Sequence, residues 1–499
     1  MRLTSAQMDR ACGVLLAAAC GDALGAGYEF SSASFDGAPR MIGGGLGGFA
    51  PGEWTDDTAQ AVAIAEVAAT GADLRSGEAL TAIARRFADW YAEDPPDVGI
   101  QTRHVLSRAG RNPTSEQVRA AAYAVHQRTG RSAGNGSLMR TGAVALAHLD
   151  DPAALVEAAM AVSALTHYED IAQQGCALWC LMIRYAVLHG ELPAAGDVVG
   201  QLPNADHWSG ILAQAEAEDP STFVNNGWVV GALQAAWSAT IHTPVPSDVP
   251  CRHLSDTLTT AIGIGHDTDT VAAIAGALLG ARWGISAIPA EWRRIVHGWP
   301  GRRGQELVEM SALIVHGGRP DHAGWPGVER VDHSHEPGFA TCIRHPHDDG
   351  LWIGGMGALD ALPEDVDAVV TLCRYGSTQV PAGAEHVVFR LIDTDDEDNP
   401  NADFVIDDAA RTVQVLRDEG KCVLLHCVAG HSRTPTVAIR YSMLRGIPLD
   451  RAFAEVIAAL PYAHPNESFR RALRRLEGMS VVASNVVNIG VESDRGITQ

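Results

Sequence analysis

The sequence predicts an all-α domain followed by an α/β domain, on three observations. Apolar and alanine residues recur at helical spacing through roughly the first 316 residues, with almost no strand-like alternation. A stretch rich in Gly, Pro, His and Asp, residues 317–338, then interrupts this periodicity. Beyond it, short strand-like runs alternate with helical segments, which is typical of an α/β domain.

The length supports a division into domains, because 499 residues are too many for one hydrophobic core. We predict an all-α domain over residues 1–318, a linker over 319–338, an α/β domain over 339–480 and a loosely ordered tail over 481–499. Hydrophobic residues make up 46% of the chain and charged residues 19%, the proportions of a soluble globular protein.

Each predicted element follows from its own pattern of apolar residues. Helices are predicted in the first domain over residues 5–20, 57–70, 78–92, 115–127, 152–162, 170–188, 226–238, 252–263, 270–282 and 305–315. Small residues in the runs 13–27 and 272–280 permit close helix packing. In the second domain, strands are predicted over residues 351–354, 368–372, 385–391 and 422–427, and helices over 402–419, 433–445, 449–460 and 466–477.

Charge and cysteine content narrow the possible partners and location. The formal net charge of −23 argues against an extended nucleic-acid or membrane-surface binder, because such binding needs a positive surface. Nine cysteines without regular spacing fit a reducing compartment, so a cytoplasmic location is expected. The apolar run 13–20 could be mistaken for a signal peptide. Asp9 precedes it and Gly21-Asp22 continue it, so a buried helix is expected. No run approaches the roughly 20 apolar residues that span a bilayer.

Two acidic segments are the strongest chemical signal in the first domain. Thr55-Asp56-Asp57 and, about 210 residues later, Asp267-Thr268-Asp269-Thr270 place carboxylates and hydroxyls where loops enter helices. Such oxygen atoms are the ligands that Mg²⁺, Mn²⁺ or Ca²⁺ prefer, and neither segment alone supplies the usual six or so. Asp-Thr pairs are also ordinary helix N-caps, so each segment by itself leaves that interpretation open.

Further polar segments accompany them in a definite order. They are Gly21-Asp22-Ala23-Leu24-Gly25 leading to Glu29, the glycine-rich run 43–48, Pro96-Asp97-Val98-Gly99, Gly134-Asn135-Gly136-Ser137 and Thr166-His167. In this order and spacing, residues 8–316 resemble the ADP-ribosylglycohydrolase family. The closest similarity is to its bacterial branch, which removes ADP-ribose from the arginine of dinitrogenase reductase.

The resemblance implies a site for two divalent cations, Mg²⁺ or Mn²⁺, between which the sequence cannot choose. The implied ligands are Thr55, Asp56, Asp57, Asp267, Asp269 and Thr270. Glu29 matches a family carboxylate that approaches the ribose as general acid or base, and burial could raise its pKa as that role requires. Asp22 lies in a tight Gly-Asp-Ala-Leu-Gly segment, and a local capping or hydrogen-bonding role is favoured for it.

The same resemblance implies a set of substrate-binding residues. They are Asp97, Gly134, Asn135, Gly136, Ser137 and His167. Backbone amides of a glycine-flanked turn can approach a pyrophosphate closely, although an ordinary Asn-Gly turn is the alternative. A single histidine is more often structural than functional, which leaves His167 the weakest member of the set.

The second domain has a different chemical signal. An apolar strand ends in Cys427, five residues lead to Arg433, and a helix follows. Loop amides and a helix N-terminus can stabilise a thiolate and bind phosphate, and an arginine can hold two phosphate oxygens. A buried structural cysteine is the alternative, which the accompanying Gly430 and Arg433 disfavour.

Residues 340–478 thereby resemble the compact dual-specificity class of cysteine-dependent protein phosphatases. The resemblance implies Cys427 as nucleophile, Arg433 and Gly430 as phosphate-binding residues, and no cofactor. Thr434 stands where the family usually has Ser, whose hydroxyl eases departure of the thiolate. The implied general acid is Asp393, after a strand ending at residue 392, with Asp395 and Asp396 as rivals in the same acidic run.

We therefore predict a bifunctional hydrolase. One domain would release ADP-ribose, with an N-glycosidic bond to arginine as the expected linkage, from an ADP-ribosylated protein or small molecule. The other would hydrolyse a phosphomonoester on a phosphorylated protein or small molecule. The alternatives are that one domain is an ADP-ribose- or phosphate-binding regulatory module, or that the chain is a binding or structural protein, as are crystallin relatives of the first family.

Overall fold

The structure, a computed structural model, describes residues 2–394 and 396–489, with only the backbone for residue 396 and residues 479–489. The chain forms two compact units, Met1–Pro326 and Gly327–Gln499. The division between the units lies inside the segment predicted as a linker. The predicted order, a helical domain followed by an α/β domain, is confirmed.

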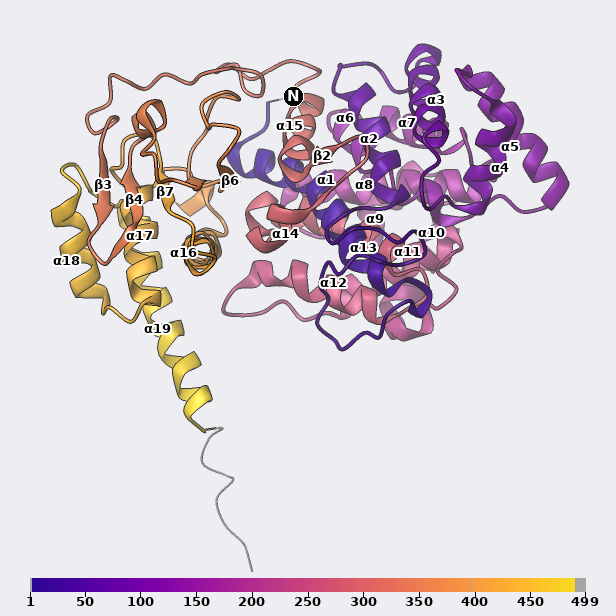
Figure 1. The fold of residues 1–499 in the computed structure, drawn as a ribbon. Coiled ribbons are helices and arrows are strands. Elements are labelled where there is room, and N and C mark those ends of the chain that lie inside the picture. Colours follow the sequence, from indigo (N-terminus) through magenta and orange to yellow (C-terminus); the bar gives the residue numbers. More distant parts are fainter. Residues whose placement is uncertain (1, 395, 490–499) are drawn as a thin grey trace, which may run out of the picture. The chain divides into compact units, whose positions relative to one another are not determined.

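The first unit is built from helices (Figure 1). They are α1 (Ser5–Gly25), α2 (Asp56–Ala68), α3 (Gly77–Ala92), α4 (Ile100–Ala109), α5 (Ser115–Thr129), α6 (Gly142–Ala147), α7 (Pro152–Ser163), α8 (Asp170–His189), α9 (Ala195–Val198), α10 (Ala205–Ala217), α11 (Val229–His242), α12 (His253–Gly263), α13 (Thr268–Trp283), α14 (Ala290–Ile295) and α15 (Gly304–Val315). Five of these helices were not predicted from the sequence: α4, α6, α9, α10 and α14. The two-stranded ribbon of β1 (His297–Gly298) and β2 (Arg302–Arg303) was not predicted either. Most of these elements are too short to show a helical or strand period.

Helices α1 and α13 pack along a seam of glycines in the middle of this unit. A Cβ atom on Gly280 would lie 2.2 Å from the Gly13 carbonyl oxygen, and one on Gly21 would lie 2.2 Å from the Ala272 carbonyl oxygen. A Cβ on Gly25 would lie 2.5 Å from the Cα of Asp269. Only glycine allows two backbones to approach so closely. The seam therefore brings the end of α1 against the start of α13.

Gly280→Ala should lower the stability of this unit, because the added methyl group meets backbone rather than a flexible side chain. We expect a loss of roughly 3 kcal/mol in the free energy of unfolding. The matched control is Gly210→Ala in α10, where a Cβ has open space; there alanine should stabilise by about 0.5–1 kcal/mol. Denaturant unfolding followed by tryptophan fluorescence reports on this unit, since Trp352 is the only tryptophan beyond residue 326. Equal stability of the two variants would contradict the close packing of the seam.

Two helical stretches are long and apolar enough to cross a membrane by length and composition, Ser5–Ser31 and Asp170–His189. The apolar window of the first is 100% buried inside the structure, and that of the second is 72% buried. Both therefore have the burial expected of core helices.

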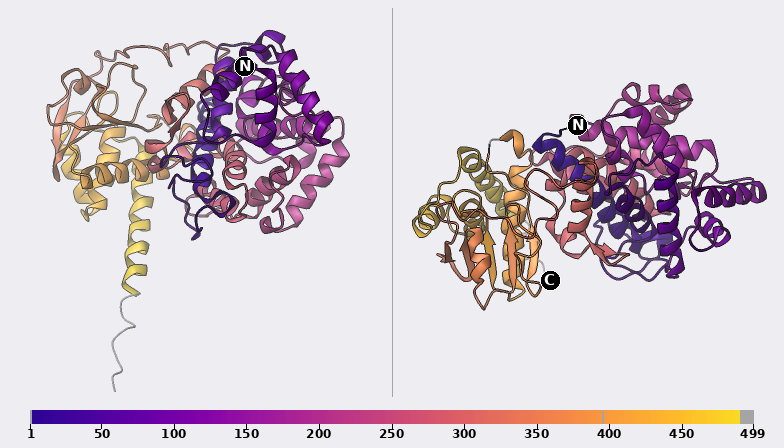
Figure 2. Two further views of the ribbon diagram at one scale, coloured as in Figure 1. Left: turned by 45° about the vertical axis from the view of Figure 1, so that its right-hand side comes forward. Right: turned by 90° about the horizontal axis from the view of Figure 1, so that it is seen from above.

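The second unit contains a five-stranded sheet. Its strands are β3 (Cys342–His345), β4 (Asp348–Gly354), β5 (Ala368–Thr371), β6 (Glu385–Val388) and β7 (Val423–His426). Their order is β3-β4-β7-β5-β6, with β3 antiparallel to β4 and the other pairs parallel. The right-hand view of Figure 2 shows the strands side by side. β7 lies in the middle with all four side chains buried, which explains its uninterrupted apolar run.

Four helices accompany the sheet, namely α16 (Ala402–Asp418), α17 (Arg433–Leu444), α18 (Leu449–Ala459) and α19 (Glu467–Ile489). α16 and α17 both contact β7, and α17 also contacts β4. α19 continues through residues 481–489, which were predicted as part of a loosely ordered tail. The reason is local, because no proline or glycine follows Gly478 before Ile489. The rest of the predicted tail, residues 490–499, lies outside the described residues.

Candidate active sites

The two acidic segments of the first unit meet at the end of the glycine seam. Asp22, Asp57 and Asp269 each offer a carboxylate oxygen, and these oxygens all lie within 4.8 Å of one another. Glu29, Asp267 and Asp269 form a second such group. Asp269 belongs to both groups, so the carboxylates form one continuous cluster, which we call the acidic cluster.

The predicted threonine ligands are directed at the same cluster. The hydroxyls of Thr55 and Thr270 lie 3.1 Å and 3.4 Å from Asp57 Oδ2. Asp57 is 1% exposed, yet its Oδ1 has no hydrogen-bond partner in the described part of the chain. A buried, unpartnered carboxylate oxygen surrounded by other oxygen ligands is what a hard divalent cation would satisfy. The residues present therefore fit the predicted cations.

Asp22 has a larger role than the sequence indicated. Its carboxylate accepts hydrogen bonds from Thr55 N and from the backbone and hydroxyl of Thr58, which lie 33 and 36 residues away. The predicted hydrogen-bonding role of Asp22 is confirmed, but its partners are distant in the sequence and not local. Its position on a buried helix of small residues was the available signal, because an ionised side chain there needs distant partners.

Burial and mutual repulsion raise the pKa values of the acidic cluster. Burial, with the charges of Asp267 and Asp97, raises the pKa of Glu29 to about 9. Burial and the charge of Asp97 likewise raise the pKa of Asp56 to about 8. The pKa of Asp269 is raised well above its ordinary value by burial and by the charge of Glu29. Positive charge placed among these carboxylates would favour their ionised forms.

A cleft of about 380 Å³ opens onto the acidic cluster, and we call it the acidic cleft. The predicted residues that line it are Glu29, Asp56, Asp97, Gly134, Asn135, Gly136, His167, Asp267, Asp269 and Thr270. Glu29 is held in place by its neighbour, since the Phe30 N–H donates to the His266 carbonyl oxygen at 2.7 Å. The predicted general acid or base and most of the predicted substrate-binding residues thus share one cavity.

Two of the predicted substrate-binding residues are directed elsewhere. Asn135 Nδ2 donates to Asp267 Oδ2 at 2.7 Å and to the Asn226 carbonyl oxygen, so its side chain orients a carboxylate of the acidic cluster. Ser137 is fully buried, bonded to Ser163 and Cys176, and does not line the acidic cleft. The turn thus directs the Ser137 hydroxyl into the core, and substrate binding through the backbone amides of this turn stays a prediction.

A buried polar chain behind the acidic cleft was missed in the sequence. Gln60 Nε2 donates to Asp56 Oδ2 at 3.0 Å, and Arg140 donates to Gln60 Oε1. Arg140 also donates to the Thr166 hydroxyl, which lies 2.8 Å from His167 Nδ1. Burial and the charge of Arg140 lower the pKa of His167 well below its ordinary value, so His167 is a neutral cleft residue. Arg140 was the available signal in the sequence for this chain, because it closely follows the Gly134-Asn135-Gly136-Ser137 turn.

The second site lies at the carboxyl end of β7. Cys427 follows the last residue of this strand and is 2% exposed. His426 Nε2 lies 2.8 Å from the Thr371 hydroxyl on β5. His426 is also paired in register with Gly354 on β4 and with Thr371. Both neighbouring strands therefore fix the point at which Cys427 leaves the sheet, where parallel sheets usually place their ligands.

The loop after Cys427 presents an incompletely satisfied arginine. Arg433 Nη1 donates to the carbonyl oxygens of Leu372 and Leu391 at 3.1 Å and 3.3 Å. Its Nε is buried and has no hydrogen-bond partner among the residues that the structure describes. Gly430 has a φ of 71°, which favours glycine and lets the loop turn toward the start of α17. A guanidinium fixed on one side with a free N–H on the other fits an anion such as phosphate.

Thr434 and Asp393, two further predicted catalytic residues, both form hydrogen bonds within the second unit. The Thr434 hydroxyl donates to the Gly354 carbonyl oxygen at 3.1 Å. This hydroxyl thus bonds to the backbone of β4, and its predicted role toward the Cys427 thiolate stays a prediction. Asp393 is exposed and accepts a hydrogen bond from Asn466 Nδ2 at 2.9 Å; β6 ends at Val388, so Asp393 lies in a loop and not directly after the strand. Asp395 lies outside the described residues, as does the side chain of Asp396.

Comparison with known families covers both sites. Residues 3–322 match the family described as ADP-ribosylglycohydrolase. Residues 368–479 match the family described as dual specificity phosphatase, catalytic domain. The first match includes the acidic cluster and the second includes the Cys427 loop.

Several curated proteins are similar to this chain, and three of them illustrate the two regions. The ADP-ribosyl-[dinitrogen reductase] glycohydrolase of Rhodospirillum rubrum is 30% identical over 57% of this chain and 89% of its own length. The ADP-ribosylarginine hydrolase Tri1 of Pseudomonas putida (strain GB-1) is 29% identical over 57% of this chain and 73% of its own. Dual specificity protein phosphatase 1 of Arabidopsis thaliana is 28% identical over 26% of this chain and 66% of its own.

Proposed function

The chain belongs to the ADP-ribosylglycohydrolase family over residues 3–322, and from this premise we propose that its first domain releases ADP-ribose from arginine side chains with the help of two divalent cations. The second domain belongs to a hydrolase family as well, the dual-specificity phosphatases. The observation that carries the first proposal is Asp269, whose carboxylate is shared by both groups of the acidic cluster.

The arginine linkage is supported by the relatives. The names of two of them refer to ADP-ribosylarginine and to ADP-ribosylated dinitrogen reductase. Mg²⁺ and Mn²⁺ are the proposed cations, and Thr55, Asp56, Asp57, Asp267, Asp269 and Thr270 the proposed ligands, because their oxygen atoms suit hard cations. When bound, such cations supply Lewis acidity that stabilises charge as a glycosidic bond breaks.

The other residues of the acidic cleft have separate proposed roles. Glu29 lies against Asp267 and Asp269 and can hold or deliver a proton at its carboxyl oxygen. Asp97 and the neutral His167 line the walls where a ribose would lie. Asn135 keeps Asp267 oriented through its 2.7 Å hydrogen bond.

The test is release of ADP-ribose from arginine-, serine- and nucleotide-linked substrates, each with Mg²⁺, with Mn²⁺ and with a chelator. We expect release from the arginine-linked substrate with a cation and none in chelator. Release from only the serine- or nucleotide-linked substrate would reject the linkage. Undiminished release in chelator would reject the cations.

For the second domain we propose cysteine-dependent hydrolysis of phosphomonoesters. The Cys427 sulfur would attack phosphorus as the bond to the leaving oxygen breaks, and Asp393 would protonate that oxygen. Water would then hydrolyse the phosphocysteine. The free Nε–H of Arg433 supports this proposal, since it lies in the loop that would hold the phosphate.

A cytoplasmic location is also proposed, and nine free thiols support it.

Asp393→Asn should slow hydrolysis of an alkyl phosphate by roughly 10² to 10⁴, because a poor leaving group needs the proton. An aryl phosphate with an acidic phenol should lose much less. Asp398→Asn, in the same acidic run but bonded to Thr394, is the matched control and should leave both rates nearly unchanged. If Asp395→Asn or Asp396→Asn shows the large loss and Asp393→Asn does not, the general acid is one of those residues.

A further inference from the structure

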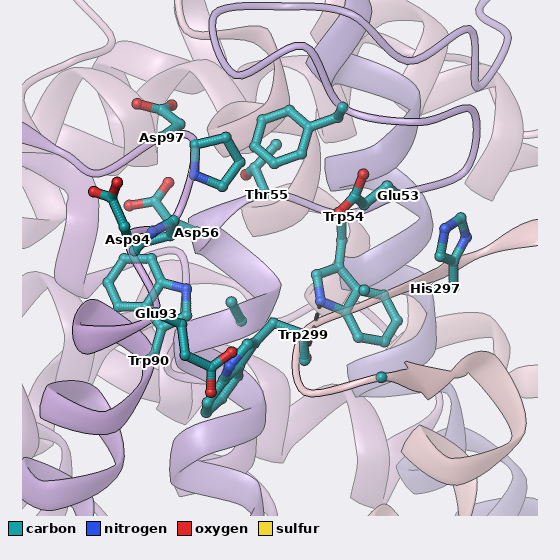
Figure 3. A pocket seen from close by; sticks show the side chains of 16 residues that line it. Glu53, Trp54, Thr55, Asp56, Trp90, Glu93, Asp94, Asp97, His297 and Trp299 are labelled. Carbon is teal, nitrogen blue, oxygen red and sulfur yellow. Dashed lines mark hydrogen bonds between the residues drawn. The ribbon is translucent and has the colours of Figure 1, made fainter.

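A second cavity, of about 370 Å³, adjoins the acidic cleft, and we call it the aromatic cavity (Figure 3). Three indole rings form much of its wall, from Trp54, Trp90 and Trp299. Asp56 and Asp97 line both cavities. A substrate whose two halves occupied the two cavities would therefore have the bond between them near these two carboxylates.

The wall of the aromatic cavity is hydrogen-bonded to the segment just before Thr55, the first of the proposed cation ligands. Trp54 N–H donates to the His297 carbonyl oxygen at 2.9 Å, and the His297 N–H donates to the Gly52 carbonyl oxygen at 2.9 Å. Trp54 Nε1 donates to the Trp299 carbonyl oxygen at 3.3 Å, the dashed line in Figure 3. These bonds tie the turn between β1 and β2 to the residues directly before Thr55. These hydrogen bonds therefore connect the aromatic cavity directly to the proposed cation ligands.

The polar groups of this cavity are acidic. Glu53, Glu93 and Asp94 line it together with the two shared aspartates, and none of the residues that line it is Lys or Arg. Glu93 and Asp94 are exposed at its rim, and neither has a cationic partner among the residues that the structure describes. Asp94 has a φ of 54°, a left-handed conformation that holds the end of α3 in a sharp turn at this rim.

The aromatic groups add a second, independent feature. Trp299 lines the cavity, and its Nε1–H is buried and has no hydrogen-bond partner among the described residues. A buried donor of this kind points to a ligand. Indole faces attract flat cations, and carboxylates at the rim pair with the N–H groups of such a cation. A guanidinium satisfies both requirements better than a hydroxyl or a nucleobase without charge.

We propose that the aromatic cavity binds the acceptor half of the substrate, an arginine side chain within a peptide, while the acidic cleft holds the ADP-ribose half. This inference rests on the proposed release of ADP-ribose from arginine. It adds the residues that select the acceptor: the partly exposed Trp299 stacks on the guanidinium, and Glu93 and Asp94 attract its charge. These residues act on recognition and not on bond breaking.

The first test neutralises the rim with Glu93→Gln and Asp94→Asn together. Both side chains are exposed, and Asn tolerates the left-handed conformation at residue 94, so the fold should persist. With an ADP-ribosylarginine peptide at low salt, kcat/KM should fall about 10-fold, mostly through KM. Affinity for free ADP-ribose should change by less than about 2-fold. Asp89→Asn is the matched control, an exposed acid on α3 that does not line the cavity.

The second test uses agmatine as a probe for the guanidinium alone. Agmatine should inhibit hydrolysis of the arginine-linked peptide, and Trp299→Leu should weaken that inhibition about 5-fold. ADP-ribose affinity again serves as the internal reference, since it reports an intact acidic cleft. A loss of both agmatine inhibition and ADP-ribose affinity in Trp299→Leu would mean that the indole is structural, and would contradict its assigned contact.

The outcomes separate this inference from the proposed function. If the wild-type protein releases no ADP-ribose from the arginine peptide, the proposed function fails and this inference fails with it. If the wild type is active but the Glu93→Gln, Asp94→Asn variant behaves like Asp89→Asn, the inference alone is overturned. The inference is supported if the rim variant has a higher KM for the arginine peptide and Trp299→Leu has weaker agmatine inhibition, while both variants still bind ADP-ribose.

Discussion

Asp269→Asn should abolish metal-dependent release of ADP-ribose while leaving the fold intact. The substitution keeps the size of the side chain but removes the one carboxylate that both groups of the acidic cluster share. We expect cation affinity to fall on the order of 10²-fold or more, since affinity depends on the number of charged ligands. The rate should fall on the order of 10³-fold, which corresponds to the several kcal/mol that a Lewis acid contributes.

The control for this prediction is Asp206→Asn, an exposed acid on α10 that lies outside the acidic cleft. Calorimetry with Mn²⁺ gives the affinity, and release of labelled ADP-ribose gives the rate. Cation binding by the wild type should also tighten as pH rises. Burial raises the pKa of Asp56 to about 8 and that of Glu29 to about 9, so protons compete with the cation below those values. Wild-type affinity in Asp269→Asn would refute the shared site.

Cys427→Ser should abolish phosphatase activity in the second domain. The sulfur is the nucleophile of the proposed reaction, and a serine hydroxyl is a far weaker nucleophile there. We expect the rate with an aryl phosphate to fall by at least on the order of 10³-fold. Binding of inorganic phosphate should persist, because Arg433 and the loop amides are unchanged.

Cys422→Ser is the matched control, since this half-buried cysteine precedes β7 and its Sγ contacts Asp365, away from the Cys427 loop. Its activity should equal that of the wild type. Near-normal turnover in Cys427→Ser, with Cys422→Ser also active, would show that the second domain hydrolyses phosphate esters by another route or only binds them. The first domain should be unaffected by either change.

Much of the fold could be predicted because local patterns agreed with it. The long helices of the first unit carry apolar residues at helical spacing, and β7 is an unbroken apolar run because it is buried in the middle of a sheet. The elements that were missed lack such patterns. β1 and β2, for example, are two residues each, and they are stabilised by the hydrogen bonds that His297 makes to the segment around Trp54.

For the candidate site residues, positions were predicted better than side-chain directions. Asp56, Asp57, Asp267 and Asp269 stand in short acidic motifs, and the structure brings them to one place. The directions of individual side chains were harder to predict. Ser137 and Thr434 both lie in motifs of the expected kind, but their hydroxyls are directed at Cys176 and Ser163, and at Gly354. A motif specifies which residues are near a site, whereas rotamers depend on neighbours that are distant in the sequence.

The glycine seam between α1 and α13 also determines when the first site can form as the chain folds. The Thr268 hydroxyl donates to the Gly25 carbonyl oxygen across 243 residues of sequence. Closing so long a loop is slow compared with forming the local helices. During synthesis, therefore, Asp22 and Glu29 leave the ribosome long before Asp269 does, and they remain without their partner carboxylate until α13 docks. Cation binding and hydrolysis should appear together, as one late event, after most of the helices have already formed.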